Sequence, residues 1–361
     1  MTTPELHKIL SQMQKLNSSD LHLKAGSPPI FRVNGEIKRS NGNPFTSDDI
    51  KKLVDECLNE GQIKKYAERH DIDFAVEVED IGRFRVNAFK QRGLCSVVAR
   101  FIKNEIPQTK DLLLPPSVDK ISSFTEGLVL VTGITGSGKS TTLTSIVDQI
   151  NRAKACHIIT IEDPIEYVHK DQKAIVNQRE LGQDTETFLG AIKYALRQDP
   201  DVILVGELRD KDTVETALQA AETGHLVLST IHSATVSQTI SRILDFFPAE
   251  RHDQIRTLLI HNLRSIISQR LLKGINKKFP RVPAVEVMFN TPPVKKAIEE
   301  KNDAHIEEIM YEDKEEGMQT FNQSLISLFK QKYITSEEAL ARSPNPEALK
   351  MNLSGIFIKN G

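Results

Sequence analysis

A short apolar run that ends in a glycine-rich turn constrains the fold of this 361-residue chain more than any other feature. Residues 128–131 read Leu-Val-Leu-Val, as a buried parallel strand requires, and they lead into Gly-x-x-x-x-Gly-Lys-Ser at 133–140. Glycines let successive backbone N–H groups face one anion, and a helix that follows adds the positive end of its dipole. The stretch therefore predicts a phosphate-binding loop between a strand and a helix.

The residues of this loop have distinct expected roles. Its backbone is predicted to surround the phosphates of ATP, with Lys139 reaching the β- and γ-phosphates and Ser140 coordinating Mg²⁺. An ordinary surface loop is the alternative, and the strand before the turn and the helix former after it argue against that reading. The predicted nucleotide-binding residues are Gly133, Ile134, Thr135, Gly136, Ser137, Gly138, Lys139, Ser140 and Thr141.

Composition and charge limit the classes of function. The length leaves room for about two domains, and 39% hydrophobic with 27% charged residues is ordinary for a globular protein. The formal charge of -2 lacks the basic footprint of a nucleic-acid-binding domain. A helicase or recombinase is disfavoured, and no specific nucleic-acid partner is expected.

Cysteine usage and hydropathy indicate the compartment. Cys57, Cys95 and Cys156 are far apart and form no Cys-x-x-Cys pair, which argues against a four-cysteine zinc site and fits a reducing compartment. No apolar run approaches the ~18 residues of a membrane span, and the first eight residues lack the apolar core of a signal peptide. The expected location is the cytoplasm, with at most a peripheral role at the inner membrane.

Alternating patterns over the first hundred positions predict a separate α+β domain at residues 1–105. Its second helix is expected to begin with Ser47 as the cap, and Asn34-Gly35 is a hairpin signal between two strands. The proline-punctuated stretch 106–120 is predicted to be a linker. The expected helices are 4–16 and 47–58, and the expected strands are 18–24, two within 28–37, 74–79, 82–89 and 94–102.

The second half of the chain alternates between apolar strands and helical segments. This order predicts an α/β domain with a mostly parallel sheet that is covered on both faces, and ligands of such sheets lie at the carboxyl ends of the strands. Residues 250–273 carry apolar residues at helical intervals and are predicted to form one or two helices. The other expected strands are 157–161, 201–205 and 225–231, and the other helices are 141–150, 185–197, 213–223, 321–332 and 336–342.

Polar residues follow these strands where a catalytic site is expected. Glu207 fits the Walker B position and is predicted to hold Mg²⁺ directly or through water. Glu166 is the candidate that orients or deprotonates the attacking water, although Glu162 and Asp163 lie nearby and spacing does not identify the base. His232 follows its strand and is a candidate sensor of the γ-phosphate.

Three further sets of basic residues are candidates. His225 lies seven residues before His232, so an extended strand directs the two side chains to opposite faces. Arg209 follows Glu207 by two positions. The strands of the first domain carry four arginines that are either solvated charges or arginines supplied to a neighbouring nucleotide site, and the sequence does not choose among them. They are Arg83, Arg85, Arg92 and Arg100.

Four segments together resemble the motifs of secretion and type IV pilus ATPases, in the same order and spacing. They are the phosphate-binding loop, Thr160-Ile-Glu-Asp-Pro-Ile-Glu166, residues 196–207 and residues 223–232. The similarity extends from Ser19 to Phe321 and is closest to the pilus-retraction branch, the PilT/PilU family. Several stretches look more like PilU members than PilT members: 176–180, 184–188, 246–251, 284–292 and 317–325.

The resemblance implies a RecA-like P-loop ATPase domain at 121–361, with C-terminal helices from about residue 250, after a PAS-like domain at 1–105. It implies that Glu166 is the catalytic base, that Glu207 is the Walker B glutamate, and that His225 and His232 are the two histidines of a "His box". Arginines of the PAS-like domain are implied to approach the nucleotide as a ring of six subunits opens and closes.

The resemblance also implies what the protein does. The implied function is that of a hexameric Mg²⁺-dependent ATPase that powers pilus retraction, for twitching motility or DNA uptake, against an inner-membrane platform protein. Assembly ATPases have longer N-terminal regions and often a four-cysteine zinc site, so the retraction branch is expected. The alternative is an accessory nucleotide-binding subunit that docks on a partner PilT-type ATPase and has little motor activity of its own.

Overall fold

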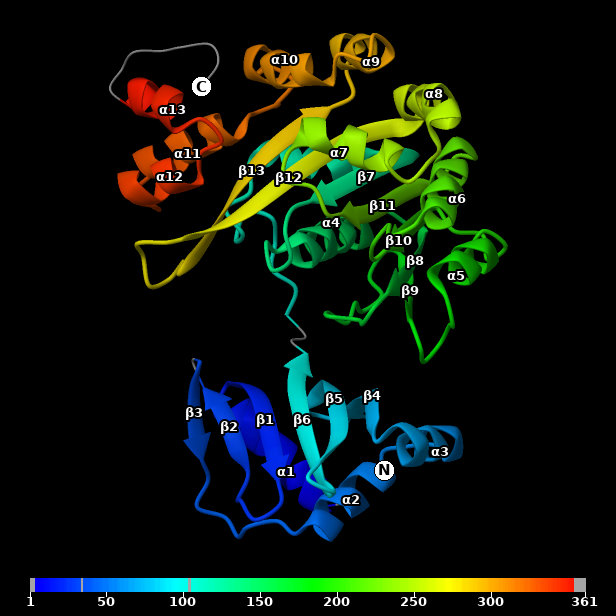
Figure 1. The fold of residues 1–361 in the computed structure, drawn as a ribbon, viewed down its shortest axis with the longest axis vertical. Helices are drawn as coiled ribbons and strands as arrows, with labels where there is room; N and C mark the ends of the chain where they lie inside the picture. Colours follow the sequence, from blue (N-terminus) through cyan, green and yellow to red (C-terminus); the bar gives the residue numbers. More distant parts are fainter. Residues whose placement is uncertain (1–3, 34, 103–104, 354–361) are drawn as a thin grey trace. The chain divides into compact units, whose positions relative to one another are not determined.

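The computed structural model describes residues 4–33, 35–102 and 105–353. The chain divides into two compact units, one of residues 1–105 with 166–168 and the other of residues 106–165 with 169–361 (Figure 1). Across the described residues, every helix is too short or too polar to cross a membrane.

The first unit is built on an antiparallel six-stranded sheet in the order β3-β2-β1-β6-β5-β4. One face is apolar and packs with the helices in a core that includes Met13, Ile50 and Phe84. The alternation that predicted strands thus reflects one buried face. The elements are α1 (Pro4–Lys15), β1 (Ser18–Lys24), β2 (Ile30–Val33), β3 (Glu36–Arg39), α2 (Ser47–Asp55), α3 (Glu60–Arg69), β4 (Asp71–Val78), β5 (Gly82–Gln91) and β6 (Leu94–Ile102).

Two local predictions for this unit need correction. Thr46, and not Ser47, caps α2, because its side chain forms a reciprocal capping box with Asp49. The Ser47 hydroxyl instead accepts a hydrogen bond from the backbone N–H of Cys95, at 3.0 Å. Helix α3 was not predicted. Asn34 of the predicted hairpin lies outside the described residues, and the strands that flank it pair antiparallel as expected.

The second unit contains a seven-stranded sheet in the order β13-β12-β7-β11-β10-β8-β9. All neighbours are parallel except β12 and β13, and β7 and β11 are buried along their whole length, which confirms the mostly parallel, doubly covered α/β sheet. Its elements are β7 (Gly127–Thr132), α4 (Lys139–Ala153), β8 (His157–Glu162), β9 (Ile175–Glu180), α5 (Phe188–Ala195), β10 (Val202–Val205), α6 (Lys211–Glu222), β11 (Leu226–Ile231), α7 (Val236–Leu244), α8 (His252–Asn262), β12 (Leu263–Lys273) and β13 (Arg281–Phe289).

The prediction of helices throughout residues 250–273 is wrong in its second half. Helix α8 ends at Asn262, and Leu263 begins β12, which pairs with β7 on one side and β13 on the other. A strand that is buried on both faces reads as a nearly continuous apolar run, and such a run also satisfies helical spacing. The C-terminal region from residue 250 therefore holds two strands before its last helices, α9 (Pro292–Glu299), α10 (Ile306–Glu312), α11 (Phe321–Lys330), α12 (Ser336–Arg342) and α13 (Pro346–Leu353).

The predicted linker 106–120 mostly packs on the second unit. Val118 is fully buried in that unit's core, within a short 3-10 helix (Pro116–Ser123). The side chain of Gln149 in α4 donates to the hydroxyl of Thr109 at 2.8 Å and to Asp119 at 2.7 Å, and Ser145 of α4 donates to the carbonyl of Pro107. These bonds fix most of the stretch to the second unit, so the predicted linker is too long.

Candidate active site

The glycine-rich turn joins β7 to α4 as the sequence predicts. Gly133, Gly136 and Gly138 all have positive φ, at 145°, 78° and 91°. Helix α4 begins at Lys139, and its N-cap residue, Gly138, has no side chain with which to cap the first N–H groups. Because those groups carry the positive end of the helix dipole, the turn and the helix start form a cradle suited to an anion.

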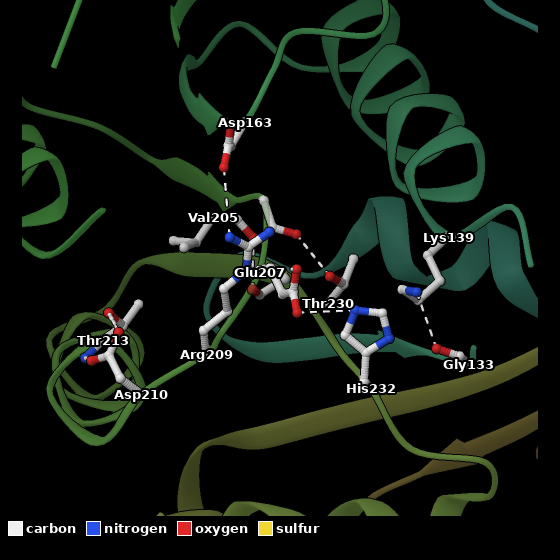
Figure 2. A network of polar contacts seen from close by, with 12 residues as sticks. Gly133, Lys139, Asp163, Val205, Glu207, Arg209, Asp210, Thr213, Thr230 and His232 are labelled. Carbon is white, nitrogen blue, oxygen red and sulfur yellow. Dashed lines mark hydrogen bonds and ion pairs between the residues drawn. The ribbon is translucent and has the colours of Figure 1, made fainter. Parts of the chain in front are cut away.

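Lys139 lies within this turn. Its side chain is 9% exposed, and Nζ donates to the carbonyl oxygens of Gly133 and Ile134 at 3.0 and 3.2 Å. The ammonium therefore sits over the start of the loop (Figure 2). The next residue, Ser140, is exposed at the first turn of α4.

A polar cluster lies at the carboxyl ends of β10 and β11, as the sheet topology predicts. Glu207 Oε1 is 3.0 Å from His232 Nε2, and Glu207 Oε2 is 2.9 Å from Arg209 Nε (Figure 2). Arg209 also lies 3.6 Å from Asp163, which follows β8. Residues that end three different strands thus meet at one edge.

Backbone contacts between β10 and β11 position Glu207. The N–H of Leu208 donates to the carbonyl of Thr230 at 3.0 Å, and the Thr230 hydroxyl donates back to the carbonyl of Gly206 at 2.8 Å. These two bonds hold the residues on both sides of Glu207 against the end of β11. The Glu207 side chain is 19% exposed, so it is shielded but accessible.

The two glutamates of residues 160–166 have different surroundings. Glu162 Oε1 accepts hydrogen bonds from Thr160 at 2.6 Å and from Gln178 at 3.1 Å, which tie it to β8 and β9. Glu166 is exposed and belongs to the segment 166–168 that groups with the first unit. Its role as the base stays a prediction.

The structure separates the two histidines of residues 223–232. His225 precedes β11, and its Nδ1 is 3.0 Å from the carbonyl of Ala220 and 3.1 Å from the hydroxyl of Thr223. His232 follows the same strand and contacts Glu207. Since the two residues lie at opposite ends of β11, His225 lies away from the edge that holds Glu207, and its role as a site residue stays a prediction.

Comparisons with known proteins identify the family. Residues 3–344 match the family described as "Type II/IV secretion system protein". The type IV pilus ATPase PilU of Pseudomonas aeruginosa is 41% identical over 347 residues, which cover 96% of this chain and 91% of PilU. The type IV pilus retraction ATPase PilT of the same organism is 42% identical over 343 residues, which cover 95% of this chain and 99% of PilT. The chain belongs to the PilT/PilU family of type IV pilus ATPases.

A solved structure of a PilT/PilU family member has the same fold as this chain. The crystal structure of the pilus retraction motor PilT with bound ADP matches with a TM-score of 0.89 and 46% identity, over 95% of this chain and 98% of that chain. This likeness confirms the α/β fold with its mostly parallel sheet. The nearly equal identities to PilU and PilT leave the preference for PilU a prediction.

The candidate arginines of the first unit fall into two places. Arg85 and Arg100 lie directly opposite each other on β5 and β6, on the exposed face of the sheet. Arg92 lies instead in the turn between these strands, with φ at 52°. Seven residues of extended strand span about 23 Å, so Arg92 and Arg85 are not candidates for the same phosphate group.

Arg100 and Arg85 differ in their carboxylate partners. Arg100 Nε donates to Asp20 at 2.8 Å, whereas the guanidinium of Arg85 is 4.0 Å from Asp73. Burial opposes ionisation of Asp20, but hydrogen bonds from Arg100 and Ser19 outweigh it and hold the pKa of Asp20 below its ordinary value. Arg100 is therefore held more tightly by a carboxylate of its own sheet than Arg85 is.

Two buried polar residues near the site were not predicted. Gln269 of β12 is 3% exposed and contacts the phosphate-binding loop. Glu286 of β13 is 2% exposed and accepts a hydrogen bond from the N–H of Val236 at 2.8 Å, at the start of α7. Complete burial raises the pKa of Glu286 to about 8. In each case the sequence signal is a polar residue within an apolar run. The spacing of residues 250–273 predicts a helix around Gln269, and no element is predicted for 281–289, which contains Glu286.

Proposed function

We propose that this chain is a Mg²⁺-dependent ATPase whose hydrolysis powers retraction of a type IV pilus. The observation that carries the proposal is the phosphate-binding turn of β7 and α4 on the same sheet edge as the Glu207 cluster, within a PilT/PilU family chain. The first unit is proposed to be PAS-like and the second RecA-like. Pilus retraction in twitching motility, or in DNA uptake, is the proposed output.

The loop residues 133–141 are proposed to bind the nucleotide. The uncapped N–H groups at the start of α4 and the buried Lys139 fit a polyphosphate, because both present positive charge to one concave surface. Lys139 leaves the carbonyls of Gly133 and Ile134 to contact the β- and γ-phosphates. It thereby offsets the charge that develops during phosphoryl transfer.

Ser140 and Glu207 are proposed to hold Mg²⁺. Mg²⁺ prefers oxygen ligands and usually keeps several waters, and it supplies charge neutralisation at the phosphates. Ser140 presents an exposed hydroxyl at the first turn of α4. Both carboxylate oxygens of Glu207 already contact Arg209 or His232, so Glu207 is proposed to act through a metal-bound water.

Glu166 and His232 are proposed to serve the chemistry at the γ-phosphate. Glu166 orients the attacking water and accepts its proton, as an exposed carboxylate is able to do. His232 senses the γ-phosphate from its position against Glu207. One of Arg85, Arg92 and Arg100, with Arg209, supplies additional positive charge.

The proposed assembly is a homohexamer that acts on an inner-membrane pilus platform protein from the cytoplasm. Nucleic acid is not a proposed partner, because the formal charge is -2. The chain is as similar to PilU as to PilT, which favours a second candidate role. In that role the chain is an accessory subunit that binds nucleotide and docks on a PilT-type ATPase.

Two measurements separate the motor from the accessory subunit. The purified chain, tested alone, should release phosphate from ATP at a steady rate of about 1 s⁻¹ or faster per subunit, within the usual range for enzymes. A strain that lacks this chain should lose pilus retraction even when the partner ATPase is present. The accessory role would be favoured if the isolated chain does not hydrolyse ATP and the deletion strain still retracts its pili as long as the partner ATPase is present.

A further inference from the structure

Gln269 lies where the phosphate-binding loop leaves the sheet. Strand β12 pairs in parallel with β7, and Ser268 is opposite Thr132, the last residue of β7. The two hydroxyls lie 2.6 Å apart, which fixes the register at this point. Gln269 is the next residue of β12, so it stands beside the first residue of the loop, Gly133.

Both ends of the Gln269 amide are used. Its Nε2 donates to the carbonyl of Ser137 at 2.7 Å, and its Oε1 accepts from the hydroxyl of Thr142 at 2.8 Å. A carbonyl can only accept, so the bond to Ser137 needs the NH₂ end of the amide and fixes its orientation. Ser137, Thr142 and Gln269 are at most 3% exposed, so water does not compete for these bonds.

Two glycines of the loop pack closely against Gln269. A Cβ at Gly133 would lie 2.4 Å from the backbone oxygen of Gln269, and a Cβ at Gly138 would lie 2.8 Å from its Nε2. Gly136, by contrast, has open space where a Cβ would be. Contact with the backbone of β12 thus requires glycine at position 133, in addition to its positive φ, and a side chain at position 138 would displace the Gln269 amide.

The bond to Ser137 orients a peptide group. In a trans peptide the carbonyl and the N–H point in opposite directions, so a Ser137 carbonyl held toward β12 directs the N–H of Gly138 away from it. That N–H is the last one before α4, at the point where the helix dipole adds to the loop. Gln269 therefore controls a donor of the anion cradle from outside the loop.

We propose that Gln269 is a positioning residue for the nucleotide site, which holds the Ser137–Gly138 peptide so that its N–H faces the phosphates. Gln269 acts through the loop and does not touch the nucleotide. The inference rests on the proposed function of residues 133–141 as the nucleotide-binding loop.

The test is calorimetric titration of ADP into the purified full chain and its variants. Gln269→Met keeps the side-chain length but removes the donor, and it should weaken ADP binding about 10- to 50-fold, as loss of one hydrogen bond to a charged group does. Gln319→Met is the matched control, because Gln319 also donates to a backbone carbonyl, that of Val285 at 2.9 Å, away from the loop. It should leave ADP affinity unchanged.

A second variant separates donor loss from altered packing. Gln269→Glu replaces the amide with a carboxyl that donates to Ser137 only when it is protonated. Its ADP affinity, relative to wild type at each pH, should recover as the pH falls from about 8.5 to about 5.5, while Gln269→Met stays weak throughout. This variant also carries the test if Gln269→Met does not fold.

The outcomes are distinct. ADP binding by Gln269→Met within about twofold of wild type, or no recovery of Gln269→Glu at low pH, would overturn the positioning role. Failure of the wild-type chain to bind ADP would overturn the proposed function itself, and the inference with it.

Discussion

The two sheets of this protein carry their charged residues in different ways. In the seven-stranded sheet, β7, β10 and β11 are buried throughout and contain no charged residue, and the charged residues stand beyond the strand ends. In the six-stranded sheet, strands such as β5 alternate between buried and exposed positions, and Arg85 and Arg100 stand on the open face. Topology alone therefore selects the functional edge of the seven-stranded sheet, whereas on the six-stranded sheet only contacts distinguish one charge from another.

Lys139→Ala is expected to have the largest effect on ATP hydrolysis at the edge of the seven-stranded sheet. Loss of the ammonium should lower phosphate release at least about 10²- to 10³-fold, because the charge on the transferred group is no longer offset. Steady-state phosphate release at saturating ATP measures it. Lys154→Ala is the matched control, since Lys154 follows α4 at its other end and donates to the carbonyl of Phe124 at 2.7 Å. If Lys139→Ala retains ATP hydrolysis, the assignment of residues 133–141 as the nucleotide-binding loop is wrong.

Glu166→Gln tests which carboxylate of residues 160–166 activates water. The variant should bind ATP normally and turn it over about 100-fold more slowly, because the amide cannot accept the proton. ATP affinity and single-turnover rate are measured together. Glu162→Gln is the comparison, as Glu162 is tied to Thr160 and Gln178. Loss of ATP binding in Glu166→Gln would make Glu166 structural, and a slow Glu162→Gln would transfer the role of the base to Glu162.

Arg85→Gln tests whether the open face of the six-stranded sheet serves a nucleotide site. Arg85 has the looser carboxylate partner, at 4.0 Å, so it is the arginine expected to contact a phosphate. In the assembled protein the ATP hydrolysis rate of the variant should be lower by a factor of about ten or more, and its melting temperature should be unchanged. Arg92→Gln, in the β5–β6 turn, should hydrolyse normally. Equal rates for Arg85→Gln and wild type would restore the reading of these arginines as solvated charge.

Glu286 provides a test of burial in the seven-stranded sheet that does not depend on ATP hydrolysis. Its pKa is raised from 4.5 to about 8 by burial, with Glu307 adding to the rise and Arg270 and the N–H groups of Val236 and Phe321 opposing it. The folded state therefore holds its proton more tightly than the unfolded state, and this contribution to the free energy of unfolding falls as the pH rises from about 4.5 to about 8.

Glu286→Gln should remove that pH dependence. The amide oxygen still accepts from Val236, so the contact at the start of α7 survives without the titration. Between about pH 6 and pH 8.5 the wild type should lose on the order of 1 to 3 kcal/mol of stability from this group, and the variant should not. Urea denaturation at the two pH values measures the difference. Parallel losses in both proteins would mean that Glu286 is ionised throughout.

The buried sheet was predictable from the sequence because apolar runs, turn glycines and strand-end carboxylates are local signals. Glu207, His232 and Lys139 lie where those signals put them. Gln269 was missed because β12 is buried on both faces and its apolar residues also fit a helix. Glu286 was missed because β13, buried almost throughout, lacks the alternation that marks a half-exposed strand. Arg85 and Arg100 could not be ranked, because their difference depends on pairing across strands that are far apart in sequence.

Hydrogen exchange with and without ADP tests the central claim most directly. If the edge beside β7, β10 and β11 is the nucleotide site, ADP should slow exchange of the backbone N–H groups of residues 133–141 more than anywhere else in the chain, because those groups face the phosphates. Smaller protection is expected around Glu207. Unchanged exchange in the loop, with protection confined to another region, would contradict the account.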